Sequence, residues 1–134
     1  MPLNIPNAAY DAYFDYFKAC TRIDIVSNEA LPTDLTGSLA HATITPGSDY
    51  TVADGDTGGS PDGRRLTVAE KAGVDVTANG TSNHAVLSYT ADGGTTWSIR
   101  LVTTCNQRIL SATDGDKVNM GTFYLQVGSP ELPV

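Results

Sequence analysis

The feature that most constrains this chain is a series of short runs, between Arg65 and Gly128, in which apolar and polar residues alternate. Alternation at every second residue places apolar side chains on one face of an extended strand. The runs are separated by pairs that are typical of tight turns, such as Asn79-Gly80 and Asp92-Gly93. Six or seven short strands at this spacing are typical of an antiparallel β-sandwich. The expected strands are 65–73, 74–78, 84–90, 96–104, 106–112 and 118–128.

The first part of the chain adds further strands and one long loop. Residues 21–27 alternate around Ile23 and Ile25 and predict a strand, and residues 39–45 fit either a strand or a turn of helix. A stretch rich in Gly, Asp and Pro follows, which predicts a loop that holds a short strand at 50–53.

An amphipathic helix is expected over residues 8–19, because aromatic residues recur there at spacings of three and four. Asn7 is placed to cap the helix, Asp11 suits its first turns and Lys18 suits its end. Half of the ten aromatic residues of the chain fall in this segment.

The aromatic stripe has two interpretations. It can cover one face or end of the domain's own sheet, as amphipathic helices commonly do. Alternatively, part of it binds another subunit, and the candidate interface residues are then Tyr10, Tyr13, Phe14 and Phe17.

The length of 134 residues suits one domain with a single core. We therefore expect a mainly β domain, an antiparallel β-sandwich of the jelly-roll or immunoglobulin-like kind, with one N-terminal α-helix. The helix takes about 8–19, the sandwich about 21–128, and 129–134 form a short C-terminal tail.

Charge and composition exclude several partners. The net charge is −7 and basic residues are scattered, whereas sequence-independent binding of nucleic acid needs a basic stripe. No apolar run approaches the length of a membrane span, so neither nucleic acid nor membrane is an expected partner. Cys20 and Cys105 are expected to stay unbridged in a protein assembled in a cytoplasm.

No catalytic or cofactor motif is present, so we expect no enzyme and no cofactor. The two histidines, His41 and His84, lack the acidic partners of a metal site or a general base, and no nucleophile motif accompanies the many Ser and Thr residues. Calcium is a lesser alternative to solvated turns, with oxygen ligands from either of two acidic loops. These candidate ligands are Asp54, Asp56 and Asp62, or Asp114 and Asp116.

Residues 80–104 read as a hairpin that turns at Asp92. Trp97 then shares a face with Ile99 and Leu101, which indicates a place in the core or at its rim. The other interpretation is an exposed stacking platform for a sugar, in which Trp97 or Tyr50 lies beside acidic side chains in a groove.

Several stretches together resemble a family of small virion proteins of tailed bacteriophages. They are the N-terminal aromatic helix, "TRIDIVSNEALP", "DGRRLTV", "VTANGTSNHAVLSY", "IRLVTTC" and "VNMGTFYLQVGSPE". The resemblance covers nearly the whole chain but includes no catalytic motif. It implies a structural role in the virion.

We therefore expect a non-enzymatic capsid decoration (cement) protein that binds and stabilises the head shell. The resemblance suggests self-association, with a trimer as one form, and binding to the major capsid protein or other virion proteins. The alternatives are a tail, neck or fibre-associated virion protein, or a carbohydrate-binding module that contacts the host surface.

Overall fold

The computed structural model describes residues 6–54 and 64–127. Within these ranges the protein has two helices, α1 (Asn7–Lys18) and α2 (Pro46–Asp49), and is otherwise built of strands. The strands are β1 (Arg22–Val26), β2 (Ser38–Thr43), β3 (Tyr50–Asp54), β4 (Arg64–Val68), β5 (Lys71–Asp75), β6 (Gly80–Thr81), β7 (His84–Tyr89), β8 (Ser98–Thr104), β9 (Ile109–Leu110), β10 (Lys117–Met120) and β11 (Phe123–Val127).

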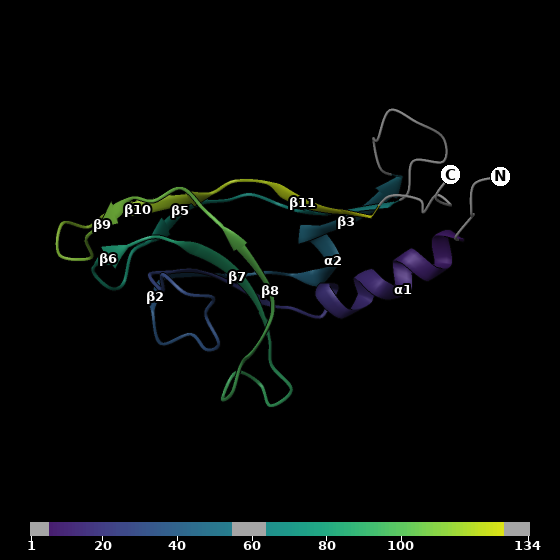
Figure 1. Ribbon diagram of the computed structural model, residues 1–134, viewed down its shortest axis with the longest axis horizontal. Helices are drawn as coiled ribbons and strands as arrows, with labels where there is room; N and C mark the ends of the chain where they lie inside the picture. The colour runs from purple at the N-terminus through teal and green to yellow at the C-terminus, as the bar shows by residue number, and fades with distance from the viewer. Residues whose placement is uncertain (1–5, 55–63, 128–134) are drawn as a thin grey trace.

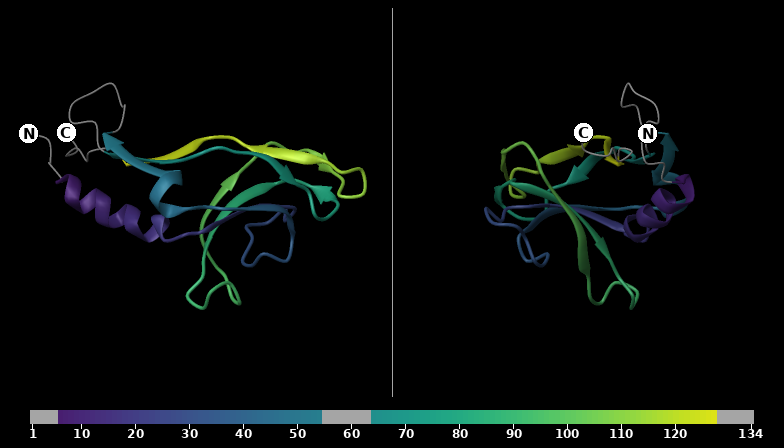
Figure 2. Two further views of the ribbon diagram at one scale, coloured as in Figure 1. Left: turned by 180° about the vertical axis from the view of Figure 1, so that it is seen from behind. Right: turned by 45° about the vertical axis from the view of Figure 1, so that its right-hand side comes forward.

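The strands form two layers, which are visible in Figure 1 and, from two other directions, in Figure 2. One layer is a four-stranded antiparallel sheet of order β2-β1-β7-β8. The other, which we call the upper layer after its place in Figure 1, holds the sheets β11-β4-β3 and β10-β5, which are also antiparallel. The predicted class, a mainly β fold of antiparallel sheets with an N-terminal helix, is confirmed.

The core lies between the two layers because the register of the strands turns their apolar residues inward. Ile23 of β1 pairs with Leu87 of β7, and both are buried together with Leu66 and Val68 of β4. The period-2 pattern predicted this face of β7 correctly.

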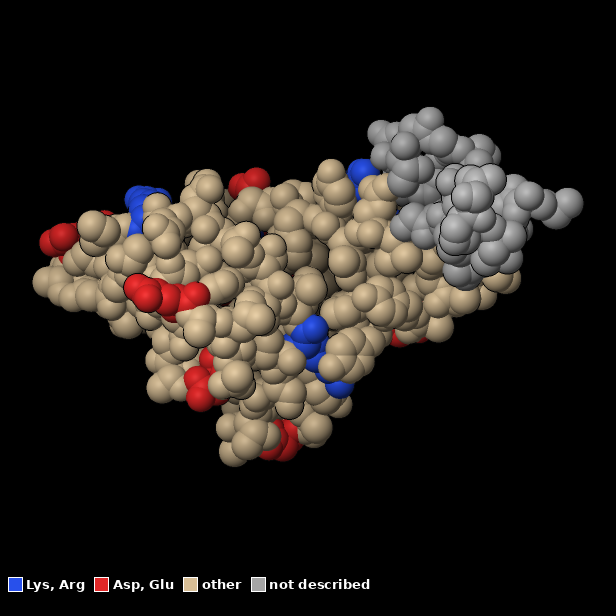
Figure 3. Space-filling view, viewed as in Figure 1, with Lys and Arg blue, Asp and Glu red and all other residues tan. Residues whose placement is uncertain are grey.

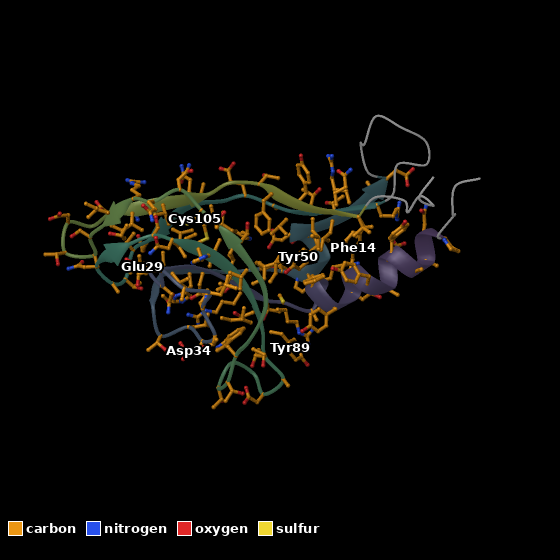
Figure 4. The ribbon with its side chains drawn as sticks, in the orientation of Figure 1. Phe14, Glu29, Asp34, Tyr50, Tyr89 and Cys105 are labelled. Atoms are coloured by element: carbon orange, nitrogen blue, oxygen red, sulfur yellow. The ribbon has the colours of Figure 1, made fainter. Side chains whose placement is uncertain are left out.

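Helix α1 covers one end of this core. Phe14 is fully buried, and Tyr10 and Phe17 are nearly so. Phe14 projects from α1 toward the sheets, with Tyr50 close to it at the start of β3 (Figure 4). The buried Tyr50 hydroxyl donates a hydrogen bond of 2.8 Å to the Cys20 carbonyl oxygen, which ties β3 to the end of the helix segment.

The start of α1 differs from the expectation. Pro6, and not Asn7, is the N-cap residue, and no side chain caps the helix. Asn7 itself takes the first helical position, and the Pro6 carbonyl oxygen accepts a hydrogen bond of 2.9 Å from the Ala9 N–H. Asp11 binds the guanidinium of Arg64 on β4, with an oxygen-to-Nε distance of 3.0 Å, which links the helix to the upper layer.

Two predicted strands are each divided in the structure. The run 65–73 breaks after β4, where the Ala69 N–H donates to the Asp49 carbonyl oxygen of α2 at 2.8 Å, and the chain continues as β5. The run 118–128 breaks at Gly121-Thr122 into β10 and β11. Both breaks occur where the chain moves from one sheet of the upper layer to the other.

Other elements also differ from the expectation. The single turn α2 and the short β6 were not predicted, and β9 is shorter than expected. The predicted tail 129–134 lies outside the described residues.

The outer face of the four-stranded sheet contains a buried carboxylate. Asp24 of β1 is fully buried and receives two hydrogen bonds from Arg22, from Nε at 2.7 Å and from a terminal nitrogen at 2.8 Å. The Ser38 hydroxyl donates a third bond, at 2.5 Å. Buried charge is tolerated only when it is paired in this way. Ser88, opposite Arg22 on β7, is also fully buried, and its hydroxyl has no hydrogen-bond partner among the described residues.

The turn between β7 and β8 is organised by the Asp92 carboxylate. It accepts hydrogen bonds from the hydroxyl of Thr96 at 2.6 Å, from the hydroxyl of Thr90 at 2.9 Å, and from the backbone N–H groups of Thr95 and Thr96 at 3.0 and 2.9 Å. These bonds favour the charged form, with those from Thr96 the strongest, and lower the pKa of Asp92 from 3.8 to about 2.

The lowered pKa of Asp92 predicts an acid-sensitive turn. Because the folded pKa lies below the unfolded value, the stabilisation is complete above pH 3.8 and is lost as the pH falls through about 2. In an NMR titration, the amide shifts of Thr95 and Thr96 should change with a midpoint near pH 2. In the Asp92→Asn variant they should not titrate, and a wild-type midpoint near pH 3.8 would contradict the prediction.

Candidate association surface

Two tyrosines of α1 remain exposed beside the buried stripe. Tyr13 is 51% exposed and Tyr16 is 52% exposed. Each ring makes an edge-to-face contact with the buried ring of Phe17, at a centroid distance of 5.3 Å in both cases. The exposed rings are therefore held against a rigid base, as aromatic pairs of this geometry are stabilising.

Arg100 completes this surface from β8. The register of β7 and β8 shifts between Leu87 and Ser88, so that β8 contains an irregularity at this residue. The guanidinium carbon of Arg100 lies 4.2 Å from the ring centroid of Tyr16 and 3.8 Å from that of Tyr89. Arg100 also donates a hydrogen bond of 2.7 Å to the Tyr16 carbonyl oxygen. We call Tyr13, Tyr16 and Arg100 the helix patch.

The structure separates the four residues that the sequence suggested as an interface. Tyr10, Phe14 and Phe17 are buried in the domain's own core, at 5%, 0% and 7% exposure, so they are not available to a partner. Only Tyr13 of the four presents its ring to solvent. Sequence reasoning missed Tyr16, although its position three residues after Tyr13 was a usable signal, and missed Arg100, for which the sequence held no signal.

The candidate sugar platform does not form as that hypothesis required. Tyr50 is 8% exposed, and desolvation raises the pKa of its hydroxyl strongly. Trp97 precedes β8 and is partly exposed. It belongs neither to the core cluster nor to the partly buried residues that pack against it, so its predicted place in the core or at its rim is wrong. Its ring faces the basic guanidinium of Arg22, whose carbon is 5.3 Å from the ring centroid.

The candidate metal ligands in the described residues, the histidines and the acidic loop residues, lie apart from one another or make hydrogen bonds and ion pairs. The ring Nδ1 of buried His84 lies 2.9 Å from the Asn28 carbonyl oxygen, and His41 is exposed on β2. Asp54 pairs with Arg64 at 2.9 Å, and the Ser111 N–H donates to Asp116 at 2.8 Å. Residues 6–54 and 64–127 contain no cluster of three potential metal ligands. Asp56 and Asp62 lie outside the described residues.

The two cysteines occupy different environments and are not joined. Cys20 is fully buried after α1, and desolvation raises the pKa of its thiol to about 11. Cys105 follows β8 and is partly exposed; burial raises the pKa of its thiol, while a hydrogen bond with Ser82 opposes the shift. A raised pKa suppresses the thiolate form of a cysteine.

The distribution of charge is visible on one face of the protein. Figure 3 shows acidic and basic residues scattered over the face that it presents. No helix in the described part of the chain is long and apolar enough to cross a membrane.

Comparison of the chain with protein-family models, with curated proteins and with solved structures finds no match.

Proposed function

We propose that this protein is a non-enzymatic structural component of a phage virion, a decoration protein that binds and stabilises the capsid shell. The observation that carries the proposal is the helix patch, in which two half-exposed tyrosines and a stacked arginine are held on a firmly packed helix. The resemblance of the chain to small virion proteins of tailed bacteriophages supports the virion as its place of action.

The composition of the patch suits association with protein. Tyrosine and arginine are among the residues that contribute most to binding at interfaces, especially when they are ordered before binding. Tyr16 is ordered by Phe17 on one side and by Arg100 on the other. Little side-chain entropy is then lost on binding.

A repeated shell strengthens a modest surface of this kind. Many identical sites, or a trimer of this protein that engages several of them, multiply the effect of one patch. The proposed partners are therefore a second copy of this chain and the major capsid protein. Attachment at the tail or neck would use the same surface, and imaging of virions that carry a labelled protein distinguishes the locations.

The test is the double variant Tyr13→Ala with Tyr16→Ala. Exposed aromatic anchors contribute about 2 kcal/mol or more each to an interface, so binding to shells that lack this protein should weaken by at least about a hundredfold. Stability of the isolated protein should change by less than about 2 kcal/mol, because the rings are half exposed. Cosedimentation with shells and thermal unfolding measure the two effects.

Tyr124→Ala is the matched control, because Tyr124 is an exposed tyrosine, at 57%, on β11. It should leave binding to shells unchanged. Wild-type protein that never cosediments with shells would refute the virion proposal, whereas equal losses in the control and the double variant would refute the role of the helix patch.

A further inference from the structure

A cleft of about 550 Å³ separates the two layers on one side of the sandwich. Figure 3 shows a hollow between the layers on the face that it presents. Apolar side chains from both layers line the cleft, among them Ile23, Ile25, Val118, Met120 and Phe123. Its polar lining residues come mainly from the end of β8 and the segment that follows it, and no acidic residue lines it among those that the structure describes.

The opposite side of the sandwich is closed by backbone pairing. Ala40 of β2 forms a bridge with Val76, just after β5, and the Thr77 N–H donates to the Leu39 carbonyl oxygen at 2.7 Å. No such pairing joins β8 to β10 or β11 in the described residues. The layers are thus sealed along β2 and open along β8.

Strand β8 lies at the edge of its sheet beside the cleft, and no strand of the described residues pairs with its outer side. Cys105 donates its N–H to the Asn83 carbonyl oxygen, in register with the β7–β8 ladder. Since hydrogen-bonding direction alternates along an antiparallel strand, Thr103 also turns toward β7, while Val102 and Thr104 turn their N–H and C=O groups outward. A free edge of this kind is a template for another strand.

Arg108 supplies a charge at one end of the cleft. Of the eight basic residues, all of which are described, it is the one whose side chain makes no ion pair, hydrogen bond or ring contact within the described residues. In a protein of net charge −7, this unpaired cation favours a carboxylate on whatever fills the cleft.

We propose that the cleft binds an extended segment of a partner protein by strand addition. The segment pairs antiparallel with β8 through Val102 and Thr104, and directs alternate apolar side chains between the layers. Its acidic residue lies toward its N-terminal end, because an antiparallel strand begins where β8 ends, next to Arg108. This site shares no residue with the helix patch, so its test is independent of the virion proposal.

The probe is a synthetic peptide of about seven residues that alternates Val and Thr after an N-terminal Glu. NMR titration of the full chain should show saturable shifts, with new exchange protection of the Val102 and Thr104 amides. A peptide of the same composition with the Glu at its C-terminal end should bind about tenfold more weakly, since its charge lies far from Arg108.

Two variants test the two contacts. Thr104→Pro removes an outward N–H without touching the β7 ladder, so the fold should persist, with a melting temperature within about 4 °C, while peptide binding is lost. Arg108→Glu should weaken binding about tenfold. Lys117→Glu is the matched control, because Lys117 is exposed and pairs with Asp75, and it should leave binding unchanged.

Three results would overturn the proposal. Peptide that produces no saturable shift at Val102 and Thr104 is one, and unchanged binding by Thr104→Pro is another. The third is that sodium decanoate shifts the signals of Ile23 and Met120 while the peptide does not, since the cleft would then be a site for small amphiphiles.

Discussion

The Phe14→Ala variant should lose about 3 to 5 kcal/mol of unfolding free energy, the cost of removing a large aromatic side chain from a core. Phe14 is fully buried, and α1 packs against β4 of one layer and β8 of the other. The loss combines the transfer free energy of the ring with the energy of the cavity. Denaturant unfolding followed by tryptophan fluorescence measures it.

Tyr16→Ala on the same helix is the control for Phe14→Ala. It removes an aromatic ring of similar size that is half exposed, and the expected loss is below about 1 kcal/mol. Similar losses for the two variants would mean that α1 does not pack on the core as described.

The Asp24→Ala variant should cost about 3 kcal/mol, toward the lower end of the range for breaking a buried ion pair. The change leaves the Arg22 guanidinium without its bidentate partner and the Ser38 hydroxyl without its acceptor. The Arg22 side chain keeps 22% exposure, and this contact with water moderates the loss. Chemical unfolding of the variant and wild type measures the difference.

A second substitution separates lost pairing from lost packing. If the uncompensated charge is the cause, Arg22→Met with Asp24→Leu should recover most of the stability, because apolar pairs can replace buried ion pairs. Asp75→Ala breaks the exposed pair with Lys117 and should cost less than about 1 kcal/mol. A double variant as unstable as Asp24→Ala would contradict the electrostatic explanation.

The alternation of apolar and polar residues predicted several of the strands, β7 among them. Along β7 the alternation placed Leu87 toward the core correctly, because one face of that strand packs against the other layer. The divisions at Ala69 and Gly121 were not predictable, since they depend on which distant strand each half pairs with. Local pattern carries no information on such partners.

The sequence also predicted part of the candidate site, because the helical period shows which aromatic residues of α1 share a face. A helical period places Tyr10, Phe14 and Phe17 on one face, and those three are the buried ones. Tyr13 and Tyr16 flank that face, and their exposure depends on tertiary packing that the helical period does not describe. The position of Arg100 depends on the irregular register of β8, for which alternation alone gives no signal.

The central place of β1 in its sheet affects how the protein is made. Strand β1 pairs with β7, so Asp24 must find Val86 far along the chain, and α1 packs against β4 and β8, which are synthesised after it. Such non-local pairing slows folding. During translation the aromatic helix emerges before the strands that bury it, and it stays without its partners until most of the chain has left the ribosome. The nascent protein therefore has a period of greatest risk of aggregation, which ends when β8 is added.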